Sequence, residues 1–258
     1  MDSQWILNKE KWGKSGAYQQ NFLWKSNKYP LYIMDNHRAA AWCWGQHVDE
    51  KDFFQITHVD YHTDTTYGEL KHWMKSLKGL SLKDLSFTEY LSLKYKPREL
   101  TPGQNHYTFT WDNYITIFYE LFKKQIRYFN CCVVEGEHLP EYIMNEDVFQ
   151  AFLPHDVIDE IEAPFQREKS ILNIDLDFFV YQQNGPRKAE ILYTENYIQD
   201  IADKVKQKLD EDRFLCVTIA LSPETSGGWE NAVKLSKMLC KRIDDSFTID
   251  ESKIQLSE

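Results

Sequence analysis

The sequence lacks the features that mark membrane, secreted and disulfide-rich proteins. No apolar run approaches the roughly 18 residues of a membrane-spanning helix. The first residues, Met-Asp-Ser-Gln-Trp, contain neither the basic segment nor the apolar stretch of a signal peptide. The five cysteines are an odd number without a Cys-x-x-Cys spacing, which fits neither a disulfide framework nor a thiolate metal site. We therefore expect a cytoplasmic protein with reduced cysteines and no membrane partner.

Positive charge is also scarce. The 30 Lys and Arg residues are outnumbered by 40 Asp and Glu residues, which gives a formal net charge of −10. Nucleic-acid binding needs a basic face, so no nucleic-acid partner is expected. An acidic field is compatible with a cationic substrate. With 42% hydrophobic residues, the composition is that of a folded protein and excludes a disordered chain.

Apolar runs alternate with amphipathic stretches, which is typical of a mostly parallel sheet covered by helices. We expect strands at 18–24, 31–34, 53–59, 127–134, 170–176 and 214–221. Helices are expected near 37–47, 69–77, 82–95, 111–125, 195–210 and 228–242. No Gly-, Ser- or Pro-rich linker divides the 258 residues, so residues 1–258 are predicted to form a single α/β domain. Turn signals at Pro97 and Pro102 predict a long surface loop over 96–110.

Acidic and histidine side chains follow three of these apolar runs. The first segment is His-Val-Asp-Tyr-His-Thr-Asp at 58–64, the second is Asn-Ile-Asp-Leu-Asp-Phe-Phe at 173–179, and the third is Ser-Pro-Glu at 222–224. Asp60, His62 and Asp64 alternate at period 2, so an extended backbone would place them on one side. Asp175 and Asp177 have the same spacing. The first two segments therefore predict a cluster of carboxylates and imidazoles.

Such a cluster is unfavourable without a counter-charge. Two carboxylates about 4 Å apart repel by roughly 4 kcal/mol at an effective dielectric of about 20. Four of them at neighbouring strand ends would raise one another's pKa unless a cation lay between them. Carboxylate oxygens and a neutral imidazole suit manganese, iron or zinc. Four carboxylates balance two divalent ions, which predicts a binuclear metallohydrolase.

Each motif also has an ordinary structural explanation. The aspartates can cap turns at polar strand ends, and His37 can be an exposed histidine at the start of a helix. Glu224 can be a loop residue before the Gly-Gly turn at 227–228. His58 lies inside an apolar run, so we interpret it as a core or supporting histidine rather than a metal ligand.

The order His37, Asp60-x-His62-x-Asp64, Asp175-x-Asp177 and Glu224 resembles the ligand order of the arginase–deacetylase superfamily, over about residues 30 to 230. The resemblance implies a three-layer α/β/α sandwich with a mostly parallel central sheet, two manganese ions (other divalent metals being possible) and a bridging hydroxide. It implies that one metal is held by His37, Asp60, Asp64 and Asp175. The second would be held by Asp60, His62, Asp175 and Asp177, with Asp60 and Asp175 bridging.

The chain differs from arginases that act on free arginine. It has Met-Asp-Asn-His at 34–37 in place of Gly-Gly-Asp-His, and Asp-Leu-Asp-Phe-Phe at 175–179 in place of their Ser-x-Asp-x-Asp-x-x-Asp-Pro segment. These details, with Ser-Pro-Glu, Gly-Gly-Trp and the segment 110–114, are similar to the peptide arginases. That resemblance implies hydrolysis of arginine side chains in a ribosomal peptide to ornithine and urea.

The resemblance and the chemistry suggest roles for further residues. Glu224 would pair with the guanidinium, and Asp177 would accept a hydrogen bond from the attacking hydroxide. A histidine is expected to protonate the departing amine, with His106 and His72 as candidates. The predicted substrate contacts are Glu224, Trp111, Asn113 and Trp229.

Two other functions stay open. One is a deacetylase or other amidohydrolase on the same fold, which commonly uses one zinc held by Asp-x-His and a further Asp. The full set of six ligands disfavours it. The other is a non-catalytic protein that binds a metal and a peptide. None of these features indicates an oligomeric state.

Overall fold

An eight-stranded sheet with the order β1-β2-β3-β12-β9-β4-β7-β8 organises the chain. We analysed a computed structural model that describes residues 4–49, 51–97, 106–132, 134, 140–162, 168–181 and 189–255. The six strands from β3 to β8 in this order are parallel, whereas β1 and β2 join the β3 edge in antiparallel pairs. The predicted mostly parallel sheet is thus confirmed.

The strands of this sheet are β1 (Trp5–Asn8), β2 (Phe22–Lys25), β3 (Leu31–Met34), β4 (Phe54–Val59), β7 (Ile126–Cys132), β8 (Phe149–Phe152), β9 (Ser170–Asp175) and β12 (Phe214–Ala220). Two small ribbons add β5 (Lys94–Tyr95) with β6 (His106–Tyr107), and β10 (Val180–Tyr181) with β11 (Glu190–Ile191). Every residue of β3, β4 and β9 is buried, as expected for central strands covered on both faces.

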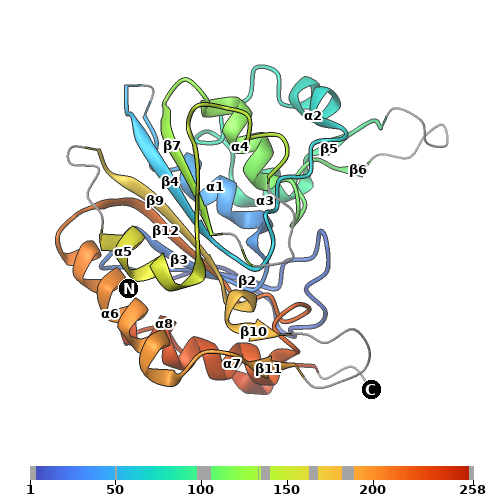
Figure 1. The fold of residues 1–258 in the computed structure, drawn as a ribbon. Coiled ribbons are helices and arrows are strands. Elements are labelled where there is room, and N and C mark those ends of the chain that lie inside the picture. The colour runs from blue at the N-terminus through green and yellow to red at the C-terminus, as the bar shows by residue number, and fades with distance from the viewer. Residues whose placement is uncertain are drawn as a thin grey trace.

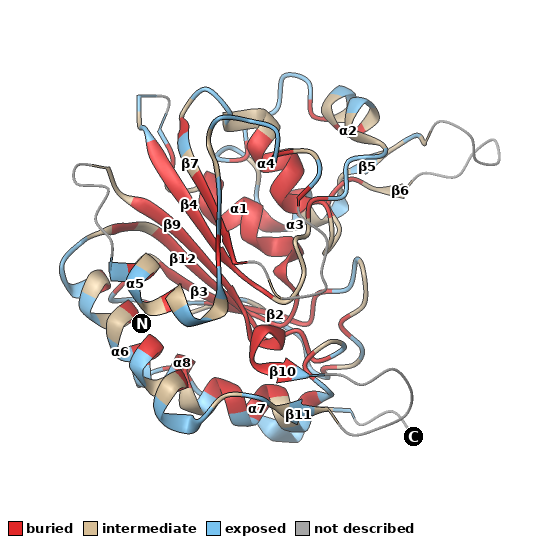
Figure 2. Cartoon of the chain, viewed as in Figure 1, coloured by how far each residue is buried: buried red, intermediate tan, exposed pale blue. Residues whose placement is uncertain are grey.

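Helices cover both faces of the sheet (Figure 1). One face carries α1 (Ala40–Gly45), α2 (Leu70–Ser76), α3 (Phe87–Ser92) and α4 (Tyr114–Phe122), and the other carries α5 (Val157–Glu162), α6 (Glu195–Asp210), α7 (Trp229–Met238) and α8 (Cys240–Ile243). Short 3₁₀ helices are η1 (His37–Ala39), η2 (Pro154–Asp156), η3 (Leu176–Phe179) and η4 (Glu251–Lys253). A hydrophobic core lies between the sheet and each helix layer. Ile171 packs into the core beneath α1 to α4 and Leu172 into the core beneath α5 to α8, because neighbouring strand residues face opposite sides. Figure 2 shows the buried strands between the two helix layers.

Several element boundaries differ from the sequence-based expectation. The strand predicted at 18–24 begins at Phe22, and the residues before it bind the buried carboxylate of Asp35 through the side-chain amide of Gln20 and the backbone N–H of Asn21. Strands β1 and β8 at the two edges of the sheet and helix α5 were not predicted. The ends of the predicted loop 96–110 are partly ordered, since β6 pairs with β5, while residues 98–105 lie outside the described residues.

The structure also bears on the state of the cysteines and on whether a helix could span a membrane. All five cysteines are free and buried. Within the described residues, none of the helices combines the length and the apolar character needed to cross a membrane.

Candidate metal centre

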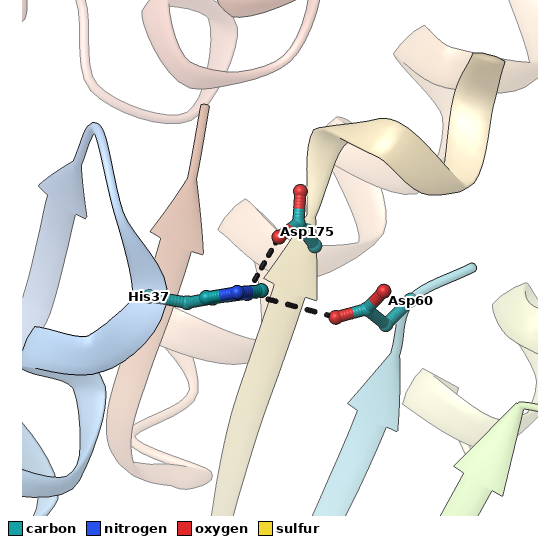
Figure 3. Close-up of side chains that lie close together, drawn as sticks. All are labelled: His37, Asp60 and Asp175. Carbon is teal, nitrogen blue, oxygen red and sulfur yellow. Dashed lines mark ion pairs between the residues drawn. The ribbon is translucent and has the colours of Figure 1, made fainter. Parts of the chain in front are cut away.

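The carboxyl ends of β3, β4 and β9 bring the first three candidate ligands together. Val59, the last residue of β4, lies beside Ile174 of β9, so the next residues, Asp60 and Asp175, are neighbours at the carboxyl ends of the two strands. His37 opens the 3₁₀ helix η1, three residues beyond the end of β3. Open α/β sheets commonly bind ligands at this edge. Figure 3 shows the imidazole of His37 pointing at both carboxylates.

The Nδ1 atom of His37 is the centre of the first group. It lies 2.6 Å from Oδ2 of Asp175, 3.2 Å from Oδ2 of Asp64 and 3.7 Å from Oδ2 of Asp60. All four side chains are at most 8% exposed. The structure therefore gathers the four residues that the resemblance assigned to one metal.

The second group forms around His62. Its Nδ1 atom donates to Oδ2 of Asp177 over 3.0 Å and lies 3.8 Å from Oδ1 of Asp60. Asp60 thus presents one oxygen to each group, as a bridging ligand would. Asp175 belongs to the first group only: its Oδ1 accepts from the backbone of Asp177 and its Oδ2 accepts from Ser222. Its bridging role stays a prediction.

A turn, rather than an extended strand, brings Asp64 into the cluster. Strand β4 ends at Val59, and the backbone N–H of His62 donates to Oδ1 of Asp60 over 2.7 Å. Asp64 then adopts a left-handed backbone with φ of 50°. Such a conformation costs on the order of 1–3 kcal/mol for a residue other than glycine and is concentrated at functional sites. The period-2 arrangement expected from the sequence is therefore wrong, although its members do converge.

Three buried polar atoms of the first group form no hydrogen bond of regular geometry in the described part of the chain, although oppositely charged atoms lie close to them. They are Nδ1 of His37, Oδ2 of Asp60 and Oδ2 of Asp64. Buried polar groups are normally paired, because an unpaired one loses its hydration without compensation. These atoms lie around one point and form a donor set that suits a divalent cation. The cluster can therefore hold a metal ion.

The charges of the cluster alter its pKa values. Burial raises the pKa of Asp60 and Asp175, and raises that of Asp64 to about 7. Burial lowers the pKa of His37, but the charges of Asp64 and Asp175 outweigh it and raise the value to about 9. The hydrogen bond to Asp177 likewise raises the pKa of His62 to about 9. Without a metal, protons on the imidazoles balance the carboxylates, and a bound cation would replace them.

His58 is a third imidazole near the cluster. Its Nε2 atom lies 3.7 Å from Oδ2 of Asp60, so His58, Asp60 and Asp64 form a further possible group. However, Nε2 also lies 3.1 Å from the backbone carbonyl of His62, which can only accept a hydrogen bond. Nδ1 lies 3.0 Å from the amide nitrogen of Asn173, which can only donate. Both ring nitrogens are thus used within the protein, as the interpretation of a supporting histidine requires.

Asn173 connects His58 to a buried polar chain that crosses the sheet. Its amide nitrogen also donates to the hydroxyl of Tyr114, whose ring stacks on His37. Its oxygen accepts from Thr218, which in turn accepts from the indole nitrogen of Trp44. Sequence reasoning did not select Asn173 or Tyr114, although Asn173 stands inside the Asn-x-Asp-x-Asp segment.

A cavity of about 640 Å³ opens over the cluster. It is lined by His37, His62, Thr63, Asp64, Thr65, Thr66, Tyr67, Gly68, Trp111, Asp112, Glu141, Asp177 and Thr225. Trp111 and Asp177, two of the predicted substrate or catalytic residues, are therefore on its wall. Glu224 is exposed beside the lining residue Thr225, and its Oε1 accepts from the backbone N–H of Ser15 over 3.1 Å.

The other predicted substrate and catalytic residues lie elsewhere. Asn113 is buried and bonds to Thr108 and Thr110 before α4. Trp229 is buried, stacks on Trp12, and its indole donates to the carbonyl of Gly13. His106 lines an adjoining cavity, and His72 on α2 lies 3.1 Å from Glu69. The catalytic and substrate roles of all four stay predictions.

In comparisons with known proteins, the sequence matches no family model and no curated protein.

Proposed function

We propose that this protein is a binuclear manganese hydrolase that converts arginine residues in a ribosomal peptide to ornithine and urea. The observation that carries the proposal is the convergence of two imidazoles and four carboxylates at one sheet edge, where three buried atoms have ion-pair neighbours but no regular hydrogen bond among the described residues. The similarity of the motifs to the peptide arginases supports this function over others that an arginase-like fold could host.

The proposed ligands are the two groups, with Asp175 added to the second as the resemblance implies. His37, Asp60, Asp64 and Asp175 would hold one metal, and Asp60, His62, Asp175 and Asp177 the second. When bound, divalent metals lower the pKa of coordinated water from 15.7 to about 7, which supplies a nucleophile at neutral pH.

The protein's own residues would orient the substrate and move protons. Asp177 lines the cavity and would accept a hydrogen bond from the attacking water. Glu224 would pair with the cationic guanidinium, an interaction that is often bidentate. Water adds to the guanidinium carbon, the bond from that carbon to the side-chain nitrogen breaks, and urea leaves. His106 would protonate the departing amine, which becomes the ornithine side chain.

Mass spectrometry of arginine-containing peptides incubated with the protein and manganese tests this proposal. We expect each converted arginine to lose the elements CH2N2, with one urea released per event. Loss of C2H2O from an acetylated lysine peptide would instead indicate a deacetylase. Peptide binding without any mass change would indicate a non-catalytic binding protein.

A further inference from the structure

A second cavity, which we call the side groove, adjoins the cavity over the metal cluster. Its volume is about 570 Å³, and it shares Thr66, Gly68, Trp111 and Asp112 with the first cavity. These four shared residues place the two cavities side by side, so a chain bound across them could have neighbouring residues in each. Pockets for whole small molecules commonly measure about 300–1,000 Å³, so two joined cavities exceed what one arginine side chain needs.

Aromatic rings dominate the wall of the side groove. Tyr18 stacks on Tyr107 with ring centroids 5.0 Å apart, and Trp73 meets the ring of Tyr95 edge-on at 6.1 Å. Trp111 stands between the two cavities. Aromatic faces attract other rings and cations.

Carboxylates add negative charge to the same wall. Glu69 and Asp112 line the side groove. Two cations, Lys94 and Arg38, lie against the ring of Tyr107. Arg38 is buried beneath the wall, so it presents little charge to a ligand. Lys94 is exposed but does not line the groove, so Glu69 and Asp112 are the carboxylates that a bound side chain meets there. The groove therefore favours aromatic or basic side chains over acidic ones.

An unpaired donor gives independent support for a ligand. Trp73 is 4% exposed, and its indole nitrogen has no hydrogen-bond partner among the described residues. A buried N–H without an acceptor is unfavourable. Each residue of a peptide carries a backbone carbonyl that accepts such a bond. Because Trp73 lines the side groove while its indole nitrogen is itself covered, a small rotation of the side chain would let a peptide carbonyl in the groove accept this bond.

Hydrogen bonds from separate parts of the chain fix the wall in place. Arg38 donates to the carbonyl of Tyr18 and, over 3.1 Å, to that of Leu91. The backbone N–H of Trp111 donates to the carbonyl of Ala17 over 3.0 Å. A wall held in this way is preformed, which reduces the entropy lost when a ligand binds.

We infer that the side groove binds the peptide residues next to the arginine whose side chain enters the metal-site cavity. This inference rests on the proposed function and narrows its substrate class to peptides with an aromatic or basic residue beside the converted arginine. A free amino acid has no neighbouring residues to place in the side groove.

The test compares three substrates of the manganese-loaded protein. They are N-acetyl-arginine methylamide, a heptapeptide with arginine between tryptophan and lysine residues, and the same heptapeptide with aspartate in place of those neighbours. We expect kcat/KM for the first heptapeptide to exceed that of the short amide by at least about tenfold. The aspartate peptide should lose this advantage. Equal kcat/KM values for all three substrates would overturn the inference.

Two variants of the side groove and a matched control test whether the groove causes the higher kcat/KM of the first heptapeptide. Tyr18→Ala removes an exposed ring, and Trp73→Phe removes the unpaired N–H while keeping an aromatic side chain. Each should reduce the advantage of the first heptapeptide by at least about fivefold. Tyr181→Ala on β10 removes a ring of similar exposure, 42% against 52% for Tyr18, and should keep the advantage. The same result for Tyr18→Ala and Tyr181→Ala would overturn the assignment.

A binding assay distinguishes failure of the proposed function from failure of the inferred groove. If no substrate releases urea, fluorescence anisotropy of the labelled heptapeptide still tests the groove. Weaker binding by Tyr18→Ala than by Tyr181→Ala would support the groove alone, and equal binding would refute it. Melting temperatures of all variants show that each one is folded.

Discussion

Asn173 on β9 donates a 3.0 Å hydrogen bond to Nδ1 of His58, its cross-strand neighbour on β4. This bond leaves the ring proton on Nε2, which donates to the backbone carbonyl of His62. Burial lowers the pKa of His58 to about 3, so the ring stays neutral. His58 thereby anchors the loop that carries Asp60 and Asp64, and has no free lone pair for a metal.

This relationship predicts how His58 variants bind metal. His58→Phe keeps a ring but removes both hydrogen bonds, so the loop loses its anchor. We expect an unchanged number of bound metals with an affinity lowered by about 10- to 100-fold, as for other residues that orient ligands. His58→Gln can still donate to the carbonyl and should lose less. Elemental analysis and calorimetry measure both quantities, and loss of one metal equivalent in both variants would show that His58 is a ligand.

Substitution of different ligands should remove different numbers of bound metal ions. Asp60 presents an oxygen to each group, so Asp60→Asn should lose both metals. Asp175→Asn should do the same if Asp175 also bridges, whereas Asp64→Asn should lose only the metal near His37. Elemental analysis of the purified variants provides the measurement. Full occupancy in Asp60→Asn would refute its bridging role.

The metal-free protein should become less stable as the pH rises from about 6.5 to about 9. His37 and His62 have pKa values raised from 6.5 to about 9 in the folded state. Their contribution to stability is therefore fully present below pH 6.5 and is lost as the pH rises through 9. We expect the melting temperature to fall by on the order of 5 °C over this range.

Saturating manganese should reverse this trend, because the imidazoles must be deprotonated to bind metal. The variant with both His37→Asn and His62→Asn provides the control: it lacks the imidazole contribution, so any remaining fall of its melting temperature comes from the buried carboxylates Asp60, Asp64 and Asp175, whose pKa values are raised. Differential scanning fluorimetry gives the melting temperatures. A metal-free protein whose melting temperature rises across this range would contradict the assigned pKa shifts.

Free arginine should be a poor substrate compared with arginine inside a peptide. The chain lacks the loop motifs with which arginases for free arginine hold the α-amine and α-carboxylate. Urea release at matched concentrations gives kcat/KM for each substrate. An equal or higher value for free arginine would show that other residues bind those groups.

Glu224→Gln tests the proposed partner of the guanidinium. The substitution keeps the shape and an acceptor for the N–H of Ser15 but removes the charge. We expect normal metal content and urea production reduced by at least about tenfold, or roughly 1.4 kcal/mol of transition-state stabilisation. Loss of a metal would make Glu224 a ligand, and unchanged activity would make it an ordinary loop residue.

Local patterns in the sequence determined the central strands and the metal-binding candidates. Continuous apolar runs predicted β4, β9 and β12, because strands covered on both faces need apolar residues throughout. The acidic residues that follow β4 and β9 could be predicted to meet, because parallel strands end at one edge. The charge of these residues, which needs a counter-ion, then predicted a cation site.

Only the tertiary structure decided how these residues are used. The left-handed turn at Asp64 and the bond between Asn173 and His58 depend on contacts between segments that are distant in the sequence. The same holds for Trp229, whose position beside the Gly-Gly turn suggested a substrate contact, whereas its ring stacks on Trp12 of the amino-terminal segment. A side chain's local pattern gives its chemistry, but its hydrogen-bond and packing partners come from strands and loops that only folding brings together.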